Sequence, residues 1–111
     1  EFGTVKDPEQ FRALYAYSPY HKVVDGTPYP DILLTADEND HRVNPSNSRK
    51  MVARLQAATS SEGYVLLRMS SGSGHGIGSA LSEDIALYAD TYAFLFDRLG
   101  VNFKPFAPSH Q

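Results

Sequence analysis

Residues 31–36 read DILLTA, and this short apolar run decides the fold. Pro30 precedes it and a polar stretch follows at residues 37–44, so its length and boundaries favour a strand over a helix. Because the run is continuous rather than alternating, we predict a strand buried on both faces, as strands of parallel sheets are. A second run, YVLLRM at residues 64–69, predicts a second strand of the same kind.

Helical patterns precede and separate the two runs. Asp7 is the expected N-cap of a first helix and Gln10 its partner in a capping box, and this helix should end before Ser18 because a proline follows. Asn44 and Pro45 predict the cap and the first turn of a second helix. Four apolar residues of this second helix keep helical spacing: Met51, Val52, Leu55 and Ala58.

A third helix is expected after residue 80. Ser82 is its predicted N-cap, and the acidic side chains of Glu83 and Asp84 suit the positive end of a helix dipole. Gly100 should end it, since a glycine after the last apolar position is a common C-terminal signal. We expect one apolar stripe of this helix to be buried: Ile85, Ala89, Tyr92, Phe96 and Leu99.

The predicted order is helix–strand–helix–strand–helix, which indicates an α/β protein with a parallel strand pair and a right-handed crossover. Two strands make a poor sheet, and strands buried on both faces need neighbours that these residues do not supply. We therefore expect residues 1–111 to form part of a larger domain, with an incomplete sheet. The start at Glu1 rather than methionine fits a cleavage product or a truncation.

Composition and charge exclude several classes of protein. Apolar residues make up 41% of the chain, with seven tyrosines and six phenylalanines, which favours a globular protein over a disordered one. The net charge of −3 comes without any basic block, which argues against nucleic acid as a partner. No apolar run approaches the roughly 18 residues that span a bilayer, so no membrane partner is expected. Cysteine is absent, and we expect no cofactor.

Titratable side chains follow both predicted strands. Functional groups of parallel sheets gather at the carboxyl ends of the strands, so these two loops should face each other if the strands are neighbours. Residues 71–78 hold His75 and four glycines. A carboxylate opposite His75 can orient its imidazole, which then takes a proton from a nucleophile. The loop after the first strand offers three acids: Asp37, Glu38 and Asp40.

Four segments carry a family likeness: YSPY at residues 17–20, YPDILLTAD at 29–37, DHRV at 40–43 and GHG at 74–76. Together they resemble the prolyl oligopeptidase family of serine peptidases, and the likeness extends to about residue 99. This family has the α/β-hydrolase fold, with a triad that runs Ser, Asp, His along the chain. The resemblance therefore implies that the chain is the C-terminal part of an α/β-hydrolase catalytic domain.

The resemblance also implies a role for four residues. Asp40 matches the acid of the triad, with Asp37 as the substitute candidate, and His75 matches the base. Arg42 matches an arginine that binds a backbone carbonyl of the substrate, and Val43 matches a neighbour that lines the same pocket. The implied substrate is a short proline-containing peptide cleaved after proline, and no metal is implied.

The nucleophile is the missing part of this site. None of the 111 residues forms a Gly-x-Ser-x-Gly elbow, so the resemblance places the serine and its oxyanion donors in an upstream segment of the same enzyme. The family's β-propeller, which restricts substrates to short peptides, is expected there as well. We expect the isolated chain to be inactive, and the parent enzyme to lie in the cytoplasm or the periplasm.

Other interpretations stay open at this point. The chain could be a non-catalytic, truncated homologue that acts as an interaction module and self-associates, or swaps strands, through exposed sheet edges. It could also come from a related α/β-hydrolase, such as an oligopeptidase, an acylaminoacyl peptidase or an esterase. Arg42 could simply be a surface residue paired with a nearby acid, and His21 and His41 are expected to be solvated or locally hydrogen-bonded.

Ion and phosphate sites are not expected. The glycine run at residues 72–78 lacks the third glycine of a dinucleotide loop and the lysine of a phosphate-binding loop. The loop from Asp37 alternates oxygen ligands, but the glycine and the closing glutamate of a calcium loop are missing. One metal site stays geometrically conceivable, built from four side chains: Asp37, Asp40, His41 and His75.

Overall fold

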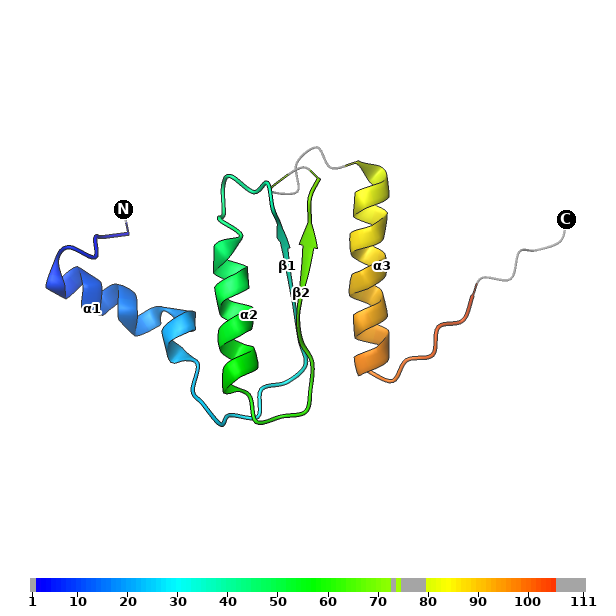
Figure 1. Cartoon of the computed structure of the whole chain (residues 1–111), viewed down its shortest axis with the longest axis horizontal. Helices are drawn as coiled ribbons and strands as arrows, with labels where there is room; N and C mark the ends of the chain where they lie inside the picture. Colours follow the sequence, from blue (N-terminus) through cyan, green and yellow to red (C-terminus); the bar gives the residue numbers. More distant parts are fainter. Residues whose placement is uncertain (1, 73, 75–79, 106–111) are drawn as a thin grey trace, which may run out of the picture. The chain divides into compact units, whose positions relative to one another are not determined.

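A computed structural model of the chain describes residues 2–72, 74 and 80–105. The two strands form one sheet and point in the same direction (Figure 1). The helix–strand–helix–strand–helix order and the parallel pair are therefore confirmed, with a short 3₁₀ helix added after the first helix. In chain order the elements are α1 (Pro8–Tyr17), η1 (Pro19–Lys22), β1 (Ile32–Asp37), α2 (Ser46–Ala58), β2 (Val65–Ser70) and α3 (Leu81–Arg98).

The chain divides into two compact units. The first unit is Glu1–Leu34 with Ser46–Leu67, and the second is Thr35–Pro45 with Arg68–Gln111. The boundary crosses both strands, so each strand begins in the first unit and ends in the second. The loop that follows β1 and the residues that follow β2 consequently belong to one unit, the second.

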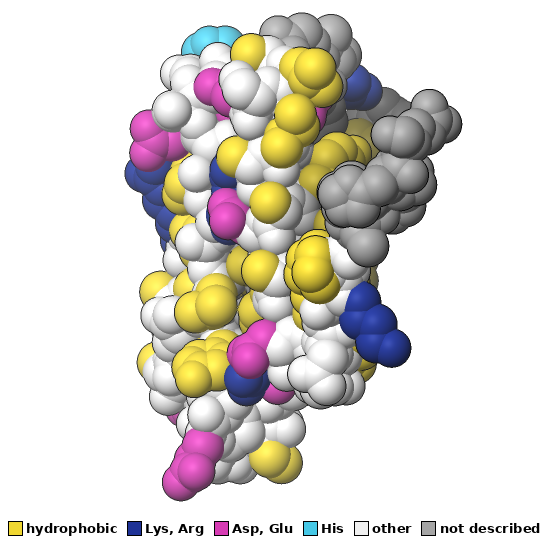
Figure 2. All heavy atoms as spheres, turned by 90° about the vertical axis from the view of Figure 1, so that its right-hand side faces the viewer, with side chains coloured by type: hydrophobic (Ala, Val, Ile, Leu, Met, Phe, Trp, Pro, Cys, Tyr) yellow, Lys and Arg dark blue, Asp and Glu magenta, His cyan; other side chains and the backbone are white. Residues whose placement is uncertain are grey.

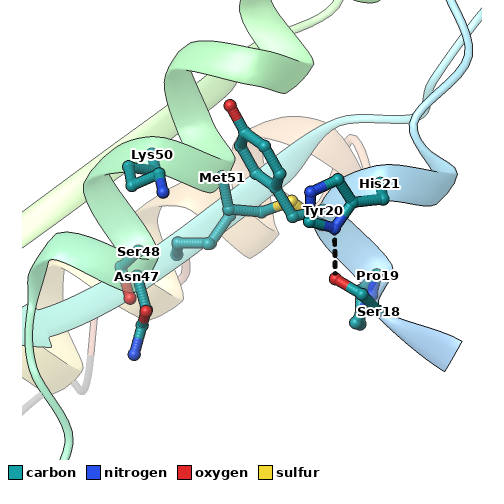
Figure 3. Close-up of a pocket in the computed structure, with 9 residues that line it drawn as sticks. Ser18, Pro19, Tyr20, His21, Asn47, Ser48, Lys50 and Met51 are labelled. Atoms are coloured by element: carbon teal, nitrogen blue, oxygen red, sulfur yellow. Dashed lines mark hydrogen bonds between the residues drawn. The ribbon is translucent and has the colours of Figure 1, made fainter. Parts of the chain in front are cut away.

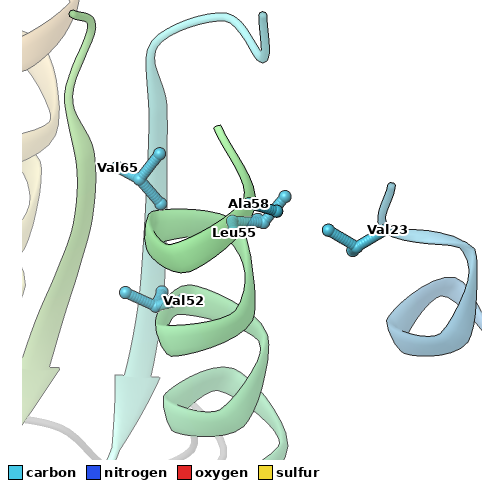
Figure 4. Close-up of a cluster of buried hydrophobic side chains, with 5 residues drawn as sticks. All are labelled: Val23, Val52, Leu55, Ala58 and Val65. Carbon is cyan, nitrogen blue, oxygen red and sulfur yellow. The ribbon is translucent and has the colours of Figure 1, made fainter. Parts of the chain in front are cut away.

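The core of the first unit forms around one face of α2. Three residues of this helix are buried, at the spacing that the sequence predicts for its apolar face. Figure 4 shows Val23 pointing toward Leu55 and Ala58, and Val65 of β2 belongs to the same buried cluster. Five hydrophobic side chains of the described residues are buried, and all are in this cluster: Val23, Val52, Leu55, Ala58 and Val65.

The start of α1 agrees with the prediction at its cap and differs from it in the capping box. The Asp7 carboxylate accepts hydrogen bonds from the backbone N–H groups of Glu9 and Gln10, each over 2.9 Å, as an N-cap does. The Gln10 side chain does not reach back to the cap. Its Oε1 instead accepts a hydrogen bond from the Thr4 backbone N–H over 2.7 Å, so the preceding segment, not the cap, uses this amide.

The two strands begin one residue later than predicted, at Ile32 and Val65, and β1 is not buried on both faces. Its side chains are half-buried, and Thr35 is exposed. The backbone N–H of Ile32 donates to the Tyr64 carbonyl over 2.7 Å, which aligns the starts of the two strands. The prediction that β1 is buried on both faces was therefore wrong for this chain.

The ends of α3 show which capping signals were correct. The helix begins at Leu81 with Ala80 as its N-cap and without a side-chain capping bond, so Ser82 lies inside the first turn and is not the cap. Gly100 ends the helix with φ +65°, as predicted. Its N–H donates to the Asp97 carbonyl, and the next N–H, of Val101, donates to the Phe96 carbonyl over 2.8 Å, which is the Schellman pattern.

The apolar stripe of α3 is not buried. No residue of this helix is buried, and Ile85, Tyr92 and Leu99 are largely exposed, contrary to the prediction. Hydrophobic side chains accordingly lie at the surface on the side of the molecule that carries α3 (Figure 2). Within its unit, α3 is joined to β2 by Arg68, whose Nε donates to Asp90 over 3.1 Å.

Candidate functional site

Asp40 lies in the loop after β1, where the sequence places the acid of the candidate site. Its carboxylate is half-buried and folds back on its own loop. The Oδ1 atom accepts two backbone hydrogen bonds, from the N–H of Arg42 over 2.9 Å and from that of Val43 over 2.8 Å. Aspartate side chains stabilise tight turns in this way. The carboxylate is thereby held in a defined place at the end of the strand.

Asp37, the substitute candidate, has a local structural role. Its Oδ1 accepts a hydrogen bond from the backbone N–H of Asn39 over 2.8 Å, and its carbonyl accepts one from the N–H of Asp40 over 3.3 Å. This side chain closes the turn by which the chain leaves β1. The structure thus gives Asp37 a turn-forming role.

The loop of Asp40 contacts the residues that follow β2. The backbone N–H of Glu38 donates to the Ser70 carbonyl over 2.8 Å, which extends the strand pairing beyond β1. One residue further, the side-chain Nδ2 of Asn39 donates to the Ser71 carbonyl over 2.8 Å. The loop of Asp40 therefore lies beside Ser70 and Ser71, as expected for the carboxyl ends of neighbouring parallel strands.

Gly74 also lies close to this loop. It has φ +85°, a conformation that side chains rarely adopt, and a Cβ atom built on it would lie 2.9 Å from the Asn39 carbonyl oxygen. Both observations require glycine at this position. His75, the predicted base, lies outside the described residues, so its pairing with Asp40 stays a prediction.

Arg42 and Val43, the predicted substrate contacts, follow directly after the acid. Both side chains are exposed, and their backbone N–H groups are the two that Asp40 binds. The backbone of these two residues is therefore held by the Asp40 carboxylate. His41, between them and the acid, is exposed as well, as the sequence led us to expect.

A cavity in the first unit was missed by the sequence analysis. It has a volume of about 490 Å³ and lies between η1, α2 and Leu34 of β1. Figure 3 shows its polar rim, where the Ser18 hydroxyl and His21 Nδ1 lie 2.8 Å apart. Lys50 Nζ lies 5.1 Å from the centre of the Tyr20 ring, within cation–π range. Of the sequence segments quoted above, only YSPY at residues 17–20 lies at this cavity, and its residue types do not by themselves predict a binding site.

The Ser18–His21 contact differs from a catalytic pair. The two residues are three positions apart in one turn, so their contact is local. The serine hydroxyl contacts Nδ1 of the imidazole. In a triad that nitrogen faces the acid instead. The Tyr15 ring lies 4.6 Å from the imidazole, centre to centre, and completes a local packing arrangement. This agrees with the expectation that His21 is locally hydrogen-bonded.

Among residues 2–72, 74 and 80–105, no three His, Cys, Asp or Glu side chains gather closely enough to hold a metal ion. In the same part of the chain, none of the helices combines the length and the apolar character that crossing a membrane requires.

The arrangement described above, in which an acid-bearing loop and a glycine-containing segment follow adjacent parallel strands, is that of an α/β protein. Residues 1–102 match the Prolyl oligopeptidase family, and the chain belongs to that family. The resemblance that the sequence segments indicated is thereby confirmed.

Curated relatives cover nearly all of this chain. The prolyl endopeptidase of Elizabethkingia meningoseptica is 35% identical over 102 residues, which are 91% of this chain and 14% of the relative. Protease 2 of Moraxella lacunata is 31% identical over 111 residues, 100% of this chain and 16% of the relative. The chain thus spans only about one-seventh of the length of the relatives it matches.

Solved structures agree with the fold. One, from a structural and mechanistic analysis of two prolyl endopeptidases, is 40% identical, covers 92% of this chain and 15% of its own, and gives a TM-score of 0.83. Another is prolyl oligopeptidase B from Galerina marginata with a 35mer hydrolysis and macrocyclization substrate, as a serine-to-alanine mutant. It is 32% identical, covers 95% of this chain and 15% of its own, and gives a TM-score of 0.81.

Proposed function

We propose that this chain supplies the acid, Asp40, and the base, His75, of a Ser-His-Asp triad in a prolyl oligopeptidase. The serine comes from a segment that precedes these residues in the parent enzyme. The chain corresponds to the C-terminal part of an α/β-hydrolase domain, since acid and histidine follow the serine in this class. The observation that carries the proposal is the contact of the two loops through Asn39 and Ser71.

The chemistry assigned to each group follows from its protons. The carboxylate of Asp40 accepts the Nδ1–H of His75, which fixes the tautomer and stabilises the imidazolium when it forms. As the serine oxygen bonds to the scissile carbonyl carbon, its proton passes to Nε2 of His75. The same proton then goes to the leaving amine as the peptide bond breaks. A water molecule, activated by the same imidazole, releases the acyl group and restores the serine.

Arg42 and Val43 are assigned to the substrate. A guanidinium can donate to a peptide carbonyl, and the exposed Val43 side chain can contact an apolar part of the peptide. The tie of both backbone N–H groups to Asp40 would keep the bound peptide in register with the acid. Cleavage after proline is supported by the relatives, most of which carry the name prolyl endopeptidase or prolyl oligopeptidase.

Two solved relatives support the roles of histidine and serine. Prolyl oligopeptidase B from Galerina marginata is described with its peptide substrate bound both as a histidine-to-alanine and as a serine-to-alanine mutant. A serine and a histidine are the nucleophile and the base that a Ser-His-Asp triad requires. We propose the same division here, with the histidine in this chain and the serine outside it.

The pairing can be tested in the 111-residue chain by following its histidine ring resonances with pH. Removing a paired carboxylate destabilises the imidazolium, so Asp40→Asn should lower the pH midpoint of the His75 resonance by about one unit. Asp37→Asn is the matched control and should shift it much less, because Asp37 closes a turn within its own loop. Equal shifts for both variants, or no shift for Asp40→Asn, would refute the pairing.

The catalytic role requires the complete enzyme. In a chain that includes the serine segment, Asp40→Asn should lower kcat by around 10⁴-fold, as the analogous change does in other triads. Arg42→Ala should instead raise KM more than it lowers kcat, because it removes a substrate contact and not a triad member. Turnover in Asp40→Asn that matches the wild-type enzyme would end the assignment.

A further inference from the structure

Asn39 contacts the short stretch of backbone that leads from β2 to His75. Three residues of this stretch are described, and we call them the lead-in residues: Ser71, Gly72 and Gly74. The side-chain Nδ2 of Asn39 donates a hydrogen bond to the Ser71 carbonyl over 2.8 Å. The backbone carbonyl oxygen of Asn39 lies so close to Gly74 that a Cβ atom built there would be 2.9 Å from it. One residue therefore meets the lead-in residues at both ends.

The remaining lead-in residue is packed from α3. A Cβ atom built on Gly72 would overlap with the carboxylate of Glu83, which lies in the first turn of that helix. Each of the three lead-in residues thus lies against a residue from another part of the second unit. Backbone that is restrained at several positions has lost much of its conformational freedom. We therefore expect a shift at Ser71 to be carried along this backbone as far as Gly74.

Asn39 directly precedes the proposed acid. Consecutive Cα atoms lie about 3.8 Å apart, so the hydrogen bond from Asn39 to Ser71 acts within one residue of Asp40. The Asp40 carboxylate is itself held by two backbone N–H groups further along the same loop. The Asn39 amide thus links the loop that holds this carboxylate to the backbone that leads to His75.

We propose that Asn39 is a positioning residue, whose side-chain amide sets the distance between Asp40 and the backbone that carries His75. The inference rests on the proposed function, because the two positioned groups are the acid and the base of that triad. A neutral donor suits this place, since a lysine or an arginine would put a positive charge beside the acid and compete with the imidazolium for it. Alignment matters because a displacement of about 1 Å can lower a rate by about 10²-fold.

Steady-state kinetics of the complete enzyme, with a short peptide that carries an anilide after proline, test the positioning role. Asn39→Ala should lower kcat by about 10- to 100-fold and change KM by less than about twofold, because it disturbs alignment and removes no substrate contact. Asn39→Leu, which removes the donor at about the same side-chain size, should be equally impaired. Asn39→Gln keeps an amide and should retain at least about threefold more activity than Asn39→Leu. Equal losses in the leucine and glutamine variants would overturn the proposal.

A control matched for stability separates positioning from a general loss of folding. Asp7→Ala removes the N-cap of α1, in the first unit, and should destabilise the protein about as much as the loss of the Asn39 hydrogen bond does. The urea midpoints of the two variants check this match. Asp7→Ala should leave kcat within about twofold of the wild-type value, because its site touches neither loop. A fall in kcat equal to that of Asn39→Ala would overturn the proposal, since both would then act through stability.

The ring resonances of His75 in the 111-residue chain give a readout that stability alone does not move. Asn39→Ala should lower their pH midpoint by at least about 0.3 units and by less than Asp40→Asn does, because the carboxylate stays but is less well placed. Asp7→Ala should leave the midpoint unchanged. If Asp40→Asn lowers both the midpoint and kcat while Asn39→Ala lowers neither, the positioning role is overturned and the proposed function stands. If Asp40→Asn lowers neither, the proposed function fails, and the positioning role fails with it.

Discussion

The side-chain amide of Asn39 donates a hydrogen bond to the backbone carbonyl of Ser71 over 2.8 Å and so joins two loops that are 32 residues apart in the chain. A side chain thus continues the ladder that Glu38 and Ser70 form through their backbones. The contact lies beside Asp40 and just before the glycine-rich segment. Its effect is to set the spacing between the two loops that the proposed triad uses.

Asn39→Ala should destabilise the chain by about 0.5–1.5 kcal/mol, because it removes one side-chain hydrogen bond to the backbone. The shift in the urea midpoint of unfolding measures this cost. Asn47→Ala is the matched control, since Asn47 is an exposed amide at the rim of the cavity. Equal effects of the two substitutions would mean that the Asn39 bond contributes no stability.

Gly74→Ala should destabilise the chain more than Gly26→Ala. Both glycines have positive φ, so each substitution incurs a backbone cost of about 1–2 kcal/mol. Only at Gly74 does the new Cβ also meet a backbone atom, the Asn39 oxygen, while Gly26 has open space around it. Chemical denaturation of both variants measures the difference. A smaller effect at Gly74 would contradict the close approach of the two loops.

Leu55→Ala should cost about 2–4 kcal/mol, because it leaves a cavity in the core of the first unit. Leu55 is 5% exposed, whereas Leu66 is 42% exposed and serves as the control. A domain of this size has little stability in reserve, so far-UV circular dichroism should show substantial unfolding of Leu55→Ala at room temperature. A native-like spectrum with an unchanged urea midpoint would place the core elsewhere.

The Arg68–Asp90 ion pair should contribute little. Asp90 is an exposed partner, and such pairs are worth about 0.2–1 kcal/mol and weaken with salt. A double-mutant cycle with Arg68→Gln and Asp90→Asn should therefore give a coupling energy in that range at low ionic strength. A control cycle that pairs Arg68→Gln with Glu9→Gln should give no coupling energy, because Glu9 is an exposed acid of α1. A coupling that exceeds the range and persists in high salt would show a buried pair.

Local sequence signals predicted the elements well because each acts over a few residues. Asp7 caps α1 and Gly100 ends α3, and both effects depend only on neighbouring backbone groups. The core face of α2 followed from periodicity alone. Ser82 failed as a cap because it lies two positions after the actual N-cap, Ala80, and so falls inside the first turn. Gln10 failed because a distant N–H, that of Thr4, competes for its amide.

Burial was harder to predict, since an apolar face does not specify what covers it. The stripe of α3 and both faces of β1 were expected to be buried, and neither is. For the site, the resemblance selected Asp40 over Asp37, whereas the carboxylates of both accept backbone hydrogen bonds within their own loop. The bond between Asn39 and Ser71 depends on strand register, which one sequence does not contain.

The location of the core has a consequence for how the chain opens. Every buried hydrophobic side chain of the described residues belongs to the first unit, while α3 and the loop of Asp40 belong to the second. Amide hydrogens of α2 should therefore exchange with solvent much more slowly than those of α3. The proposed acid would then lie in the part of the chain that opens most often. Its catalytic precision would have to be conferred from outside, by whatever packs against that part.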